Sequence, residues 1–161
     1  MSYTIVEASE DSPYGYHPYG GASELFVCKS REIILHGPAG TGKTRACLEK
    51  LDICAWKYDG MRAAIVRKTR RSMTASVLVT YGTKVLLPQT PVRFSTSRQE
   101  YIYPNGSTLT LSGMDKASKI LSAEFDLIYV AQAEELSEDD WETLLTRLRF
   151  GRIPYQQLIA D

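Results

Sequence analysis

The alternation of apolar and polar segments along the chain predicts an α/β fold built on a mostly parallel sheet. Short continuous apolar runs, which are typical of strands buried on both faces, occur at residues 32–35, 61–66, 125–130 and 156–160. Between the first two runs, apolar residues recur at helical spacing, and Gly60 follows them at the position where a helix commonly ends. This segment predicts a helix over residues 43–58.

A different texture begins after residue 90, where apolar and polar residues alternate with a period of two. The alternating segments are 92–94, 100–103 and 108–111, and Pro104-Asn105-Gly106-Ser107 separates the last two. Such a turn between two alternating segments predicts an antiparallel hairpin around residues 100–111, added to the parallel sheet. We expect further helices over residues 22–30, 72–86 and 115–121, and another that begins after Ser137 as its N-cap.

The first apolar run leads directly into a glycine-rich loop with the spacing G-x-x-x-x-G-K-T. The loop consists of Gly37, Pro38, Ala39, Gly40, Thr41, Gly42, Lys43 and Thr44. A strand, this loop and a helix in that order predict a phosphate loop, in which backbone N–H groups surround the phosphates of ATP. Lys43 is then expected to contact the β- and γ-phosphates, and the Thr44 hydroxyl to bind Mg²⁺. A glycine-rich turn without a ligand is the alternative.

An ATPase of this class also needs carboxylates at the end of a second strand, which we expect beside the phosphate-loop strand. The run at 125–130 is the candidate, but Ala131 and Gln132 follow it where an acidic pair would stand. Glu134 and Glu135 come next and are the candidate catalytic acids, with Glu135 preferred and Gln132 as a nucleotide contact. Alternatively, the two glutamates only complement the N-terminus of the next helix. Hydrolysis would then be slow or absent while binding survives.

A run of cations follows the strand predicted at 61–66. Arg67 is a candidate nucleotide sensor or arginine finger, and Lys68, Arg70 and Arg71 are candidate contacts to DNA phosphates. A solvated basic surface is the alternative interpretation of this run.

Two tyrosines precede the phosphate loop, in a segment rich in turn residues. Tyr16 or Tyr19 could stack on the nucleotide base, although packing against the domain is the alternative.

Composition adds bounds rather than a function. The 161 residues carry 19 basic and 19 acidic side chains, so no overall field attracts nucleic acid, and a contact with DNA would depend on local patches. Three cysteines without C-x-x-C spacing indicate reduced thiols in a cytosolic protein. No apolar run approaches the ~18 residues of a membrane span, so no membrane association is expected. We expect one domain over residues 1–161, with an irregular N-terminal segment at 1–21.

Taken together, these motifs resemble the ATPase domain of tailed-bacteriophage terminase large subunits. The matching segments are the phosphate loop with Arg45-Ala46, then Ile65-Val66-Arg67-Lys68-Thr69-Arg70, Ser97-Arg98-Gln99-Glu100-Tyr101, Tyr103-Pro104-Asn105-Gly106-Ser107, Asp126-Leu127-Ile128-Tyr129-Val130, Ala133-Glu134-Glu135-Leu136 and Pro154-Tyr155-Gln156-Gln157-Leu158-Ile159-Ala160-Asp161. Gly37, Gly42, Lys43 and Thr44 match the family's phosphate loop, and Arg67 matches its basic motif. Gln132 stands where relatives carry a glutamate, which leaves the catalytic base open.

The resemblance implies a motor that uses Mg²⁺ and ATP to move double-stranded DNA into a prohead in the host cytoplasm. Its implied partners are a portal ring, a small terminase subunit and other copies of itself in a ring of about five. Members of the family continue into a nuclease domain that this sequence lacks, so we expect an ATPase domain that is incomplete at its C-terminal end. A nucleotide-binding fragment without turnover, or another P-loop DNA-dependent ATPase, is the alternative.

Overall fold

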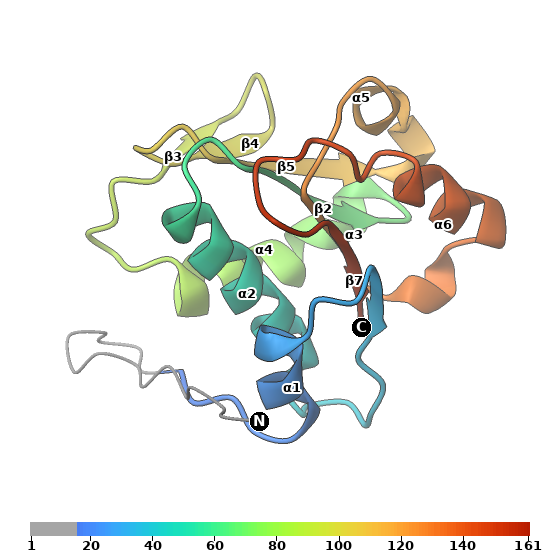
Figure 1. The fold of residues 1–161 in the computed structure, drawn as a ribbon, viewed down its shortest axis with the longest axis horizontal. Coiled ribbons are helices and arrows are strands. Elements are labelled where there is room, and N and C mark those ends of the chain that lie inside the picture. The colour runs from blue at the N-terminus through green and yellow to red at the C-terminus, as the bar shows by residue number, and fades with distance from the viewer. Residues whose placement is uncertain (1–15) are drawn as a thin grey trace.

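The core of the protein is a twisted β-sheet with helices on both faces (Figure 1). The computed structural model of the chain describes residues 16–161, and these contain seven strands in one sheet with the order β1-β7-β6-β2-β5-β4-β3. The strands are β1 (Glu32–Ile34), β2 (Arg62–Arg67), β3 (Arg93–Ser95), β4 (Glu100–Ile102), β5 (Thr108–Gly113), β6 (Leu127–Val130) and β7 (Gln157–Ala160). Pairing is parallel from β1 through β5, whereas β4 is antiparallel to both of its neighbours. The predicted α/β fold and its hairpin at 100–111 are therefore confirmed.

Helices cover the two faces of this sheet. They are α1 (Gly21–Val27), α2 (Lys43–Lys57), α3 (Arg70–Thr74), α4 (Val77–Thr80), α5 (Ser118–Leu121) and α6 (Glu138–Leu145), with short 3₁₀ turns at Met114–Lys116 and Ala133–Glu135. On β2, Ala63 and Ile65 face the layer that contains α1, α2, α3 and α4, and Ala64 and Val66 face α5 and α6. Because both faces are covered, the central strands are apolar at every position, as expected for a parallel sheet. None of the helices within residues 16–161 is long and apolar enough to cross a bilayer.

The single helix predicted over 72–86 is wrong. The segment forms α3, then α4, and then a π-helical turn at Tyr81–Val85. Ser76 interrupts the first two with φ −129° and ψ −71°, and the following stretch combines β-branched residues with Gly82, which are poor helix formers. The strand predicted at 125–130 is also shorter than expected, since Phe125 makes only an isolated bridge with Leu148.

The expected position of the second catalytic strand is wrong as well. The neighbour of the phosphate-loop strand β1 is β7, and β6 lies one strand further away. The chain leaves β6, forms α6, and returns to the sheet between β6 and β1. Ala160 consequently pairs with Ile34 on one side and with Val130 on the other. The residue after Ala160 is therefore closer to the phosphate loop than any residue that follows β6.

Candidate functional site

The predicted phosphate loop connects the end of β1 to the start of α2, at the carboxyl edge of the parallel strands. Gly40 and Gly42 have φ values of 79° and 78°, which place them in the left-handed region that favours glycine. A Cβ atom built on either glycine would meet no heavy atom within 4 Å, so open space adjoins this side of the loop. This loop thus has room for a ligand against its backbone.

The N-terminus of α2 is suited to an anion. Gly42 is its N-cap and provides no side-chain hydrogen bond, and the first turn contains no acidic residue. The first N–H groups of this 15-residue helix are accordingly not capped by a side chain. The Lys43 ammonium bends back over the loop and donates to the carbonyls of Gly37 and Pro38 at 2.9 and 2.8 Å. A cation and a helix N-terminus therefore meet in one small loop, and this combination fits the phosphates of a nucleotide.

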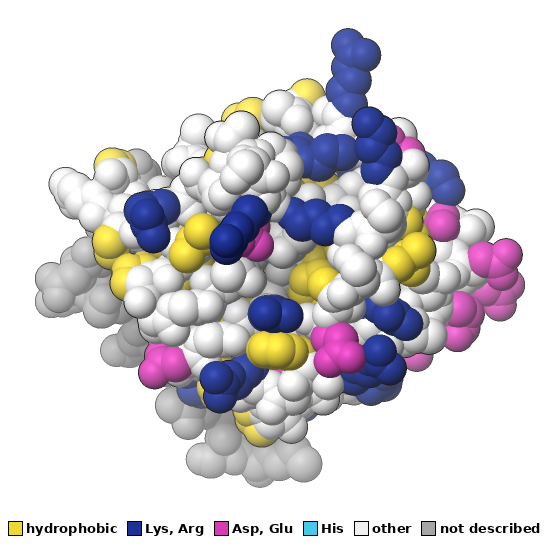
Figure 2. All heavy atoms as spheres, turned by 90° about the horizontal axis from the view of Figure 1, so that it is seen from above, with side chains coloured by type: hydrophobic (Ala, Val, Ile, Leu, Met, Phe, Trp, Pro, Cys, Tyr) yellow, Lys and Arg dark blue, Asp and Glu magenta, His cyan; other side chains and the backbone are white. Residues whose placement is uncertain are grey.

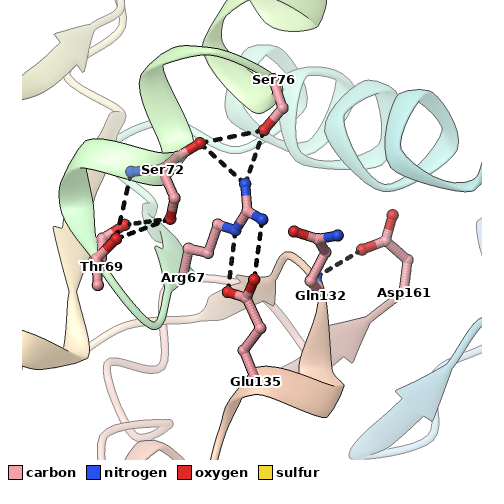
Figure 3. Close-up of polar contacts among 7 residues, drawn as sticks. All are labelled: Arg67, Thr69, Ser72, Ser76, Gln132, Glu135 and Asp161. Atoms are coloured by element: carbon pink, nitrogen blue, oxygen red, sulfur yellow. Dashed lines mark hydrogen bonds and ion pairs between the residues drawn. The ribbon is translucent and has the colours of Figure 1, made fainter.

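Thr44 contacts a residue that the sequence reasoning did not assign to the site. Its hydroxyl donates to Asp161 Oδ2 at 2.5 Å. Asp161 follows β7 directly, and its other carboxylate oxygen accepts the backbone N–H of Gln132 at 3.2 Å (Figure 3). The predicted metal-binding hydroxyl and the exit of β6 are thus linked through one carboxylate. The sequence does carry a signal for Asp161, an acid that directly follows an apolar run, but the meaning of that signal depends on the strand order.

Arg67 and Glu135 form the second cluster of the site. The Arg67 guanidinium donates from Nε to Glu135 Oε2 at 3.1 Å and from Nη2 to Oε1 at 3.0 Å. Its Nη1 donates to the Ser72 carbonyl and the Ser76 hydroxyl at 2.9 and 3.0 Å (Figure 3). Arg67 thus connects the end of β2, the α3–α4 segment and the loop after β6. The structure places these two candidate residues in direct contact, although they are 68 residues apart in the sequence.

The exit of β6 carries the other candidates. Ala131 is buried, whereas Gln132 and Glu134 are exposed. Gln132 has φ 56° and ψ 70°, a left-handed conformation that is uncommon for a residue with a side chain. Glu134 makes no hydrogen bond or ion pair to another side chain within residues 16–161. The structure hence brings Gln132 to Asp161 and Glu135 to Arg67, and leaves Glu134 at the surface.

Asp126, at the other end of β6, has a structural role. Its carboxylate is fully buried and accepts backbone N–H groups from Arg62, Arg152 and Ile153 at 3.2, 2.8 and 3.4 Å. These bonds lie at the amino edge of the sheet, away from the phosphate loop. Asp126 therefore satisfies buried backbone donors.

The cations after Arg67 differ in their environments. Lys68 donates to Asp140 at 2.8 Å and thereby lowers the pKa of that carboxyl. Arg70 donates to Gln99 at 2.5 Å, whereas Arg71 is exposed. Other Lys and Arg side chains, with Asp and Glu among them, are spread over the face seen in Figure 2, so positive charge is not confined to this segment.

The two tyrosines before the loop also differ. Tyr16 packs against Phe26 and under the Arg45 guanidinium, and burial raises its pKa to about 12. Tyr19 is 69% exposed, and its hydroxyl donates to the Thr41 carbonyl of the phosphate loop at 3.3 Å. Of the two, Tyr19 has the free ring surface beside the loop.

Comparison with known proteins places the chain in a family. The family model for the phage terminase large subunit matches residues 29–159, which include the phosphate loop, Arg67, Gln132 and Glu135. The chain belongs to the phage terminase large subunit family. No curated protein sequence matches this terminase chain.

Solved structures of large terminases share its fold. The large terminase ATPase domain of Thermus phage P74-26 matches with a TM-score of 0.66 and 16% identity, over 92% of this chain and 66% of that one. The large terminase of bacteriophage HK97 gives 0.66 and 13%, over 91% and 33%. A large terminase from a thermophilic bacteriophage, solved in complex with ADP, gives 0.65 and 12%, over 84% and 34%. This terminase chain therefore spans about a third of the length of the last two proteins.

Proposed function

We propose that this terminase chain is the ATP-binding part of a viral DNA-packaging motor, in which ATP hydrolysis drives double-stranded DNA into a prohead. The observation that carries the proposal is the loop at residues 37–44, with two left-handed glycines, an uncapped helix N-terminus and Lys43 folded over it. Membership of the terminase family and the ADP complex of a large terminase with the same fold support a nucleotide as the ligand.

The residues of this loop divide the binding task. The backbone N–H groups of residues 40–44 and the Lys43 ammonium would hold the phosphates, and Lys43 would exchange its two carbonyl partners for phosphate oxygens. The Thr44 hydroxyl lies at the start of α2, where it would bind Mg²⁺. When bound, Mg²⁺ neutralises phosphate charge that develops during hydrolysis. Tyr19 offers its exposed ring to the base.

Turnover requires a group that activates water, and Glu135 is our candidate. Both of its oxygens accept hydrogen bonds from Arg67, so the guanidinium holds the carboxylate in one orientation. Arg67 would thus position the base, and Gln132 would offer its side-chain amide to water or the γ-phosphate. Glu134 is the second candidate acid in the same turn.

A second function, nucleotide binding without turnover, is favoured by a specific observation. Ala131 and Gln132 directly follow β6, and neither has a carboxylate. In this alternative, Glu135 serves only as an ion-pair partner for Arg67, and the phosphate loop keeps its ligand intact.

The remaining roles concern the whole motor. Lys68, Arg70 and Arg71 are proposed contacts to DNA phosphates, with Arg71 the most accessible of the three. A portal ring, a small terminase subunit and further copies of this chain in a ring are the proposed partners, and the host cytoplasm is the proposed location. The HK97 protein and the ADP-bound large terminase are about three times as long, so these roles belong to the complete protein.

A phosphate-release assay separates the two functions. The motor proposal predicts Mg²⁺-dependent release from ATP, which Lys43→Ala abolishes and Glu135→Gln reduces by about 10²-fold or more. The exposed Asp59 at the opposite edge of the sheet provides a matched control, and Asp59→Asn should retain the wild-type rate. If the wild type binds ATP yet releases no phosphate, the second function is correct.

A further inference from the structure

The end of β6 lacks the carboxylate that a P-loop site needs near its metal ion. Ala131 occupies the first position after the strand, and its methyl group has no capacity to bind a cation. Glu135 follows four residues later, and both of its oxygens accept hydrogen bonds from Arg67. The acid for Mg²⁺ must therefore come from another element.

Strand β7 delivers such an acid beside the phosphate loop. Since Ala160 pairs with Ile34 and with Val130, Asp161 leaves the sheet level with Leu35 and with Ala131. Three backbone hydrogen bonds hold this point: Leu35 N–H to the Ala160 carbonyl at 2.8 Å, Asp161 N–H to the Val130 carbonyl at 3.3 Å, and Ala133 N–H to the Asp161 carbonyl at 3.0 Å. The carboxylate thus stands one strand nearer the loop than a residue at position 131.

The contacts of this carboxylate converge on the predicted metal ligand. Thr44 donates to Oδ2 at 2.5 Å, and the Gln132 N–H donates to Oδ1 at 3.2 Å. A threonine hydroxyl that donates its proton to a carboxylate keeps its oxygen lone pairs available for a cation. The geometry therefore orients Thr44 as a metal ligand.

A buried hydroxyl gives an independent observation. The side chain of Tyr129 on β6 is fully buried, and its hydroxyl makes no hydrogen bond of standard geometry to residues 16–161. Burial raises its pKa well above the ordinary value, Cys47 and Asp161 raise it further, and Thr44 counteracts them. An unpartnered polar group beside Thr44 and Asp161 costs free energy unless a ligand or water satisfies it. This position has the properties of a polar binding site.

We propose that Asp161 supplies the carboxylate of the Mg²⁺ site, in place of an acid at the end of β6. The ligand is a divalent cation bound to the phosphates of a nucleotide, so this inference rests on the proposed function. Mg²⁺ prefers oxygen ligands and keeps several of its waters, so one hydroxyl, one carboxylate and phosphate oxygens suffice. Asp161 binds the ion directly or accepts a hydrogen bond from a water on it, and in both cases its charge favours the ion.

The test is the Mg²⁺ dependence of ATP-γ-S binding, measured by calorimetry with and without Mg²⁺. We expect Mg²⁺ to tighten binding to the wild type, and Asp161→Asn to reduce that gain by about 10–100-fold while leaving metal-free binding unchanged. Asp161→Glu should restore part of the gain, and Asp59→Asn, a matched exposed change at the opposite edge, should keep all of it. Electron paramagnetic resonance of Mn²⁺ with ADP provides a second readout, because loss of a carboxylate near the ion alters its spectrum.

The outcomes separate this inference from the proposed function. If the wild type binds no nucleotide, both fail. If the wild type shows the gain with Mg²⁺ and Asp161→Asn shows the same gain, the nucleotide site stands and the role of Asp161 is overturned. If Asp161→Asn weakens binding equally with and without Mg²⁺, the residue only shapes the loop, and the inference is also overturned. Thr44→Ser should retain the gain and Thr44→Ala should lose it.

Discussion

The Arg67 guanidinium and the Glu135 carboxylate form a two-point ion pair that joins the end of β2 to the turn after β6. The arginine side chain is 12% exposed and the glutamate 35% exposed, so the pair lies at the boundary of the protein and solvent. Two parallel hydrogen bonds fix the relative orientation of these groups more strictly than a single contact would. The pair therefore holds the candidate base in a defined place.

We expect the pair to contribute a measurable coupling energy. A double-mutant cycle with Arg67→Ala and Glu135→Gln should give about 1 kcal/mol in urea unfolding, a value moderated by the exposure of Glu135. Arg67→Lys keeps the charge but loses the two-point geometry, so it should recover less than half of that coupling.

The matched control is the Arg149–Glu124 pair, whose side chains are 59% and 44% exposed. Its coupling should be close to zero, because water screens an exposed pair. Equal coupling energies in the two cycles would contradict the positioning role of Arg67.

Tyr19 is expected to bind the nucleotide base through its ring. Tyr19→Ala should weaken ATP-γ-S binding by about tenfold, the order that loss of one base–aromatic stack produces. Tyr19→Phe should bind as the wild type does, because it keeps the ring and loses only the hydrogen bond to Thr41. Fluorescence titration measures both changes.

Inorganic triphosphate serves as the control ligand for Tyr19, because it lacks a base. Its affinity should be the same for the wild type and Tyr19→Ala. A parallel loss for triphosphate would show that Tyr19 acts on the loop through Thr41.

A buried acid on α2 should make stability depend on pH. Asp52 accepts hydrogen bonds from the hydroxyls of Tyr81 and Tyr103. Burial raises its pKa to about 6, although these two hydrogen bonds lower it. Since the unfolded value is about 4, the folded state binds more protons between pH 4 and 6. The free energy of unfolding should accordingly fall by roughly 2 kcal/mol as the pH rises through this window.

Asp52→Asn tests this pH dependence, because asparagine keeps an oxygen acceptor for the tyrosines and does not titrate. Urea unfolding at a series of pH values should show a smaller decline between pH 4 and 6 than in the wild type. Asp59→Asn, a change at an exposed acid, should leave the wild-type decline intact. A decline that persists in Asp52→Asn would assign it to another group.

Much of the fold could be predicted because its signals are local. The glycine spacing, the apolar run before it and the helical pattern after it all lie within residues 32–58, and the structure has β1, the loop and α2 there. The hairpin at 100–111 likewise follows from period-two alternation and one turn. The break at Ser76 could not be predicted, because the apolar pattern continues through it and only the backbone angles reveal it.

The site was harder to predict because its contacts depend on strand order. The runs that form β6 and β7 are similarly short and apolar, and nothing local indicates which one lies beside β1. With β6 expected as the neighbour, Glu134 and Glu135 are the natural candidate acids and Asp161 is not. Arg67 and Glu135 are each identifiable as candidates, but their contact spans 68 residues and follows from the pairing of β2 with β6.

Calorimetric titration of this terminase chain with ATP-γ-S in the presence of Mg²⁺ decides whether residues 37–44 bind a nucleotide. We predict saturable binding of one nucleotide per chain, lost in Lys43→Ala and retained in Lys57→Ala, which changes a lysine at the far end of the same helix. Equal binding by the wild type and Lys43→Ala, or no binding by the wild type, would contradict the assignment of this loop as the nucleotide site.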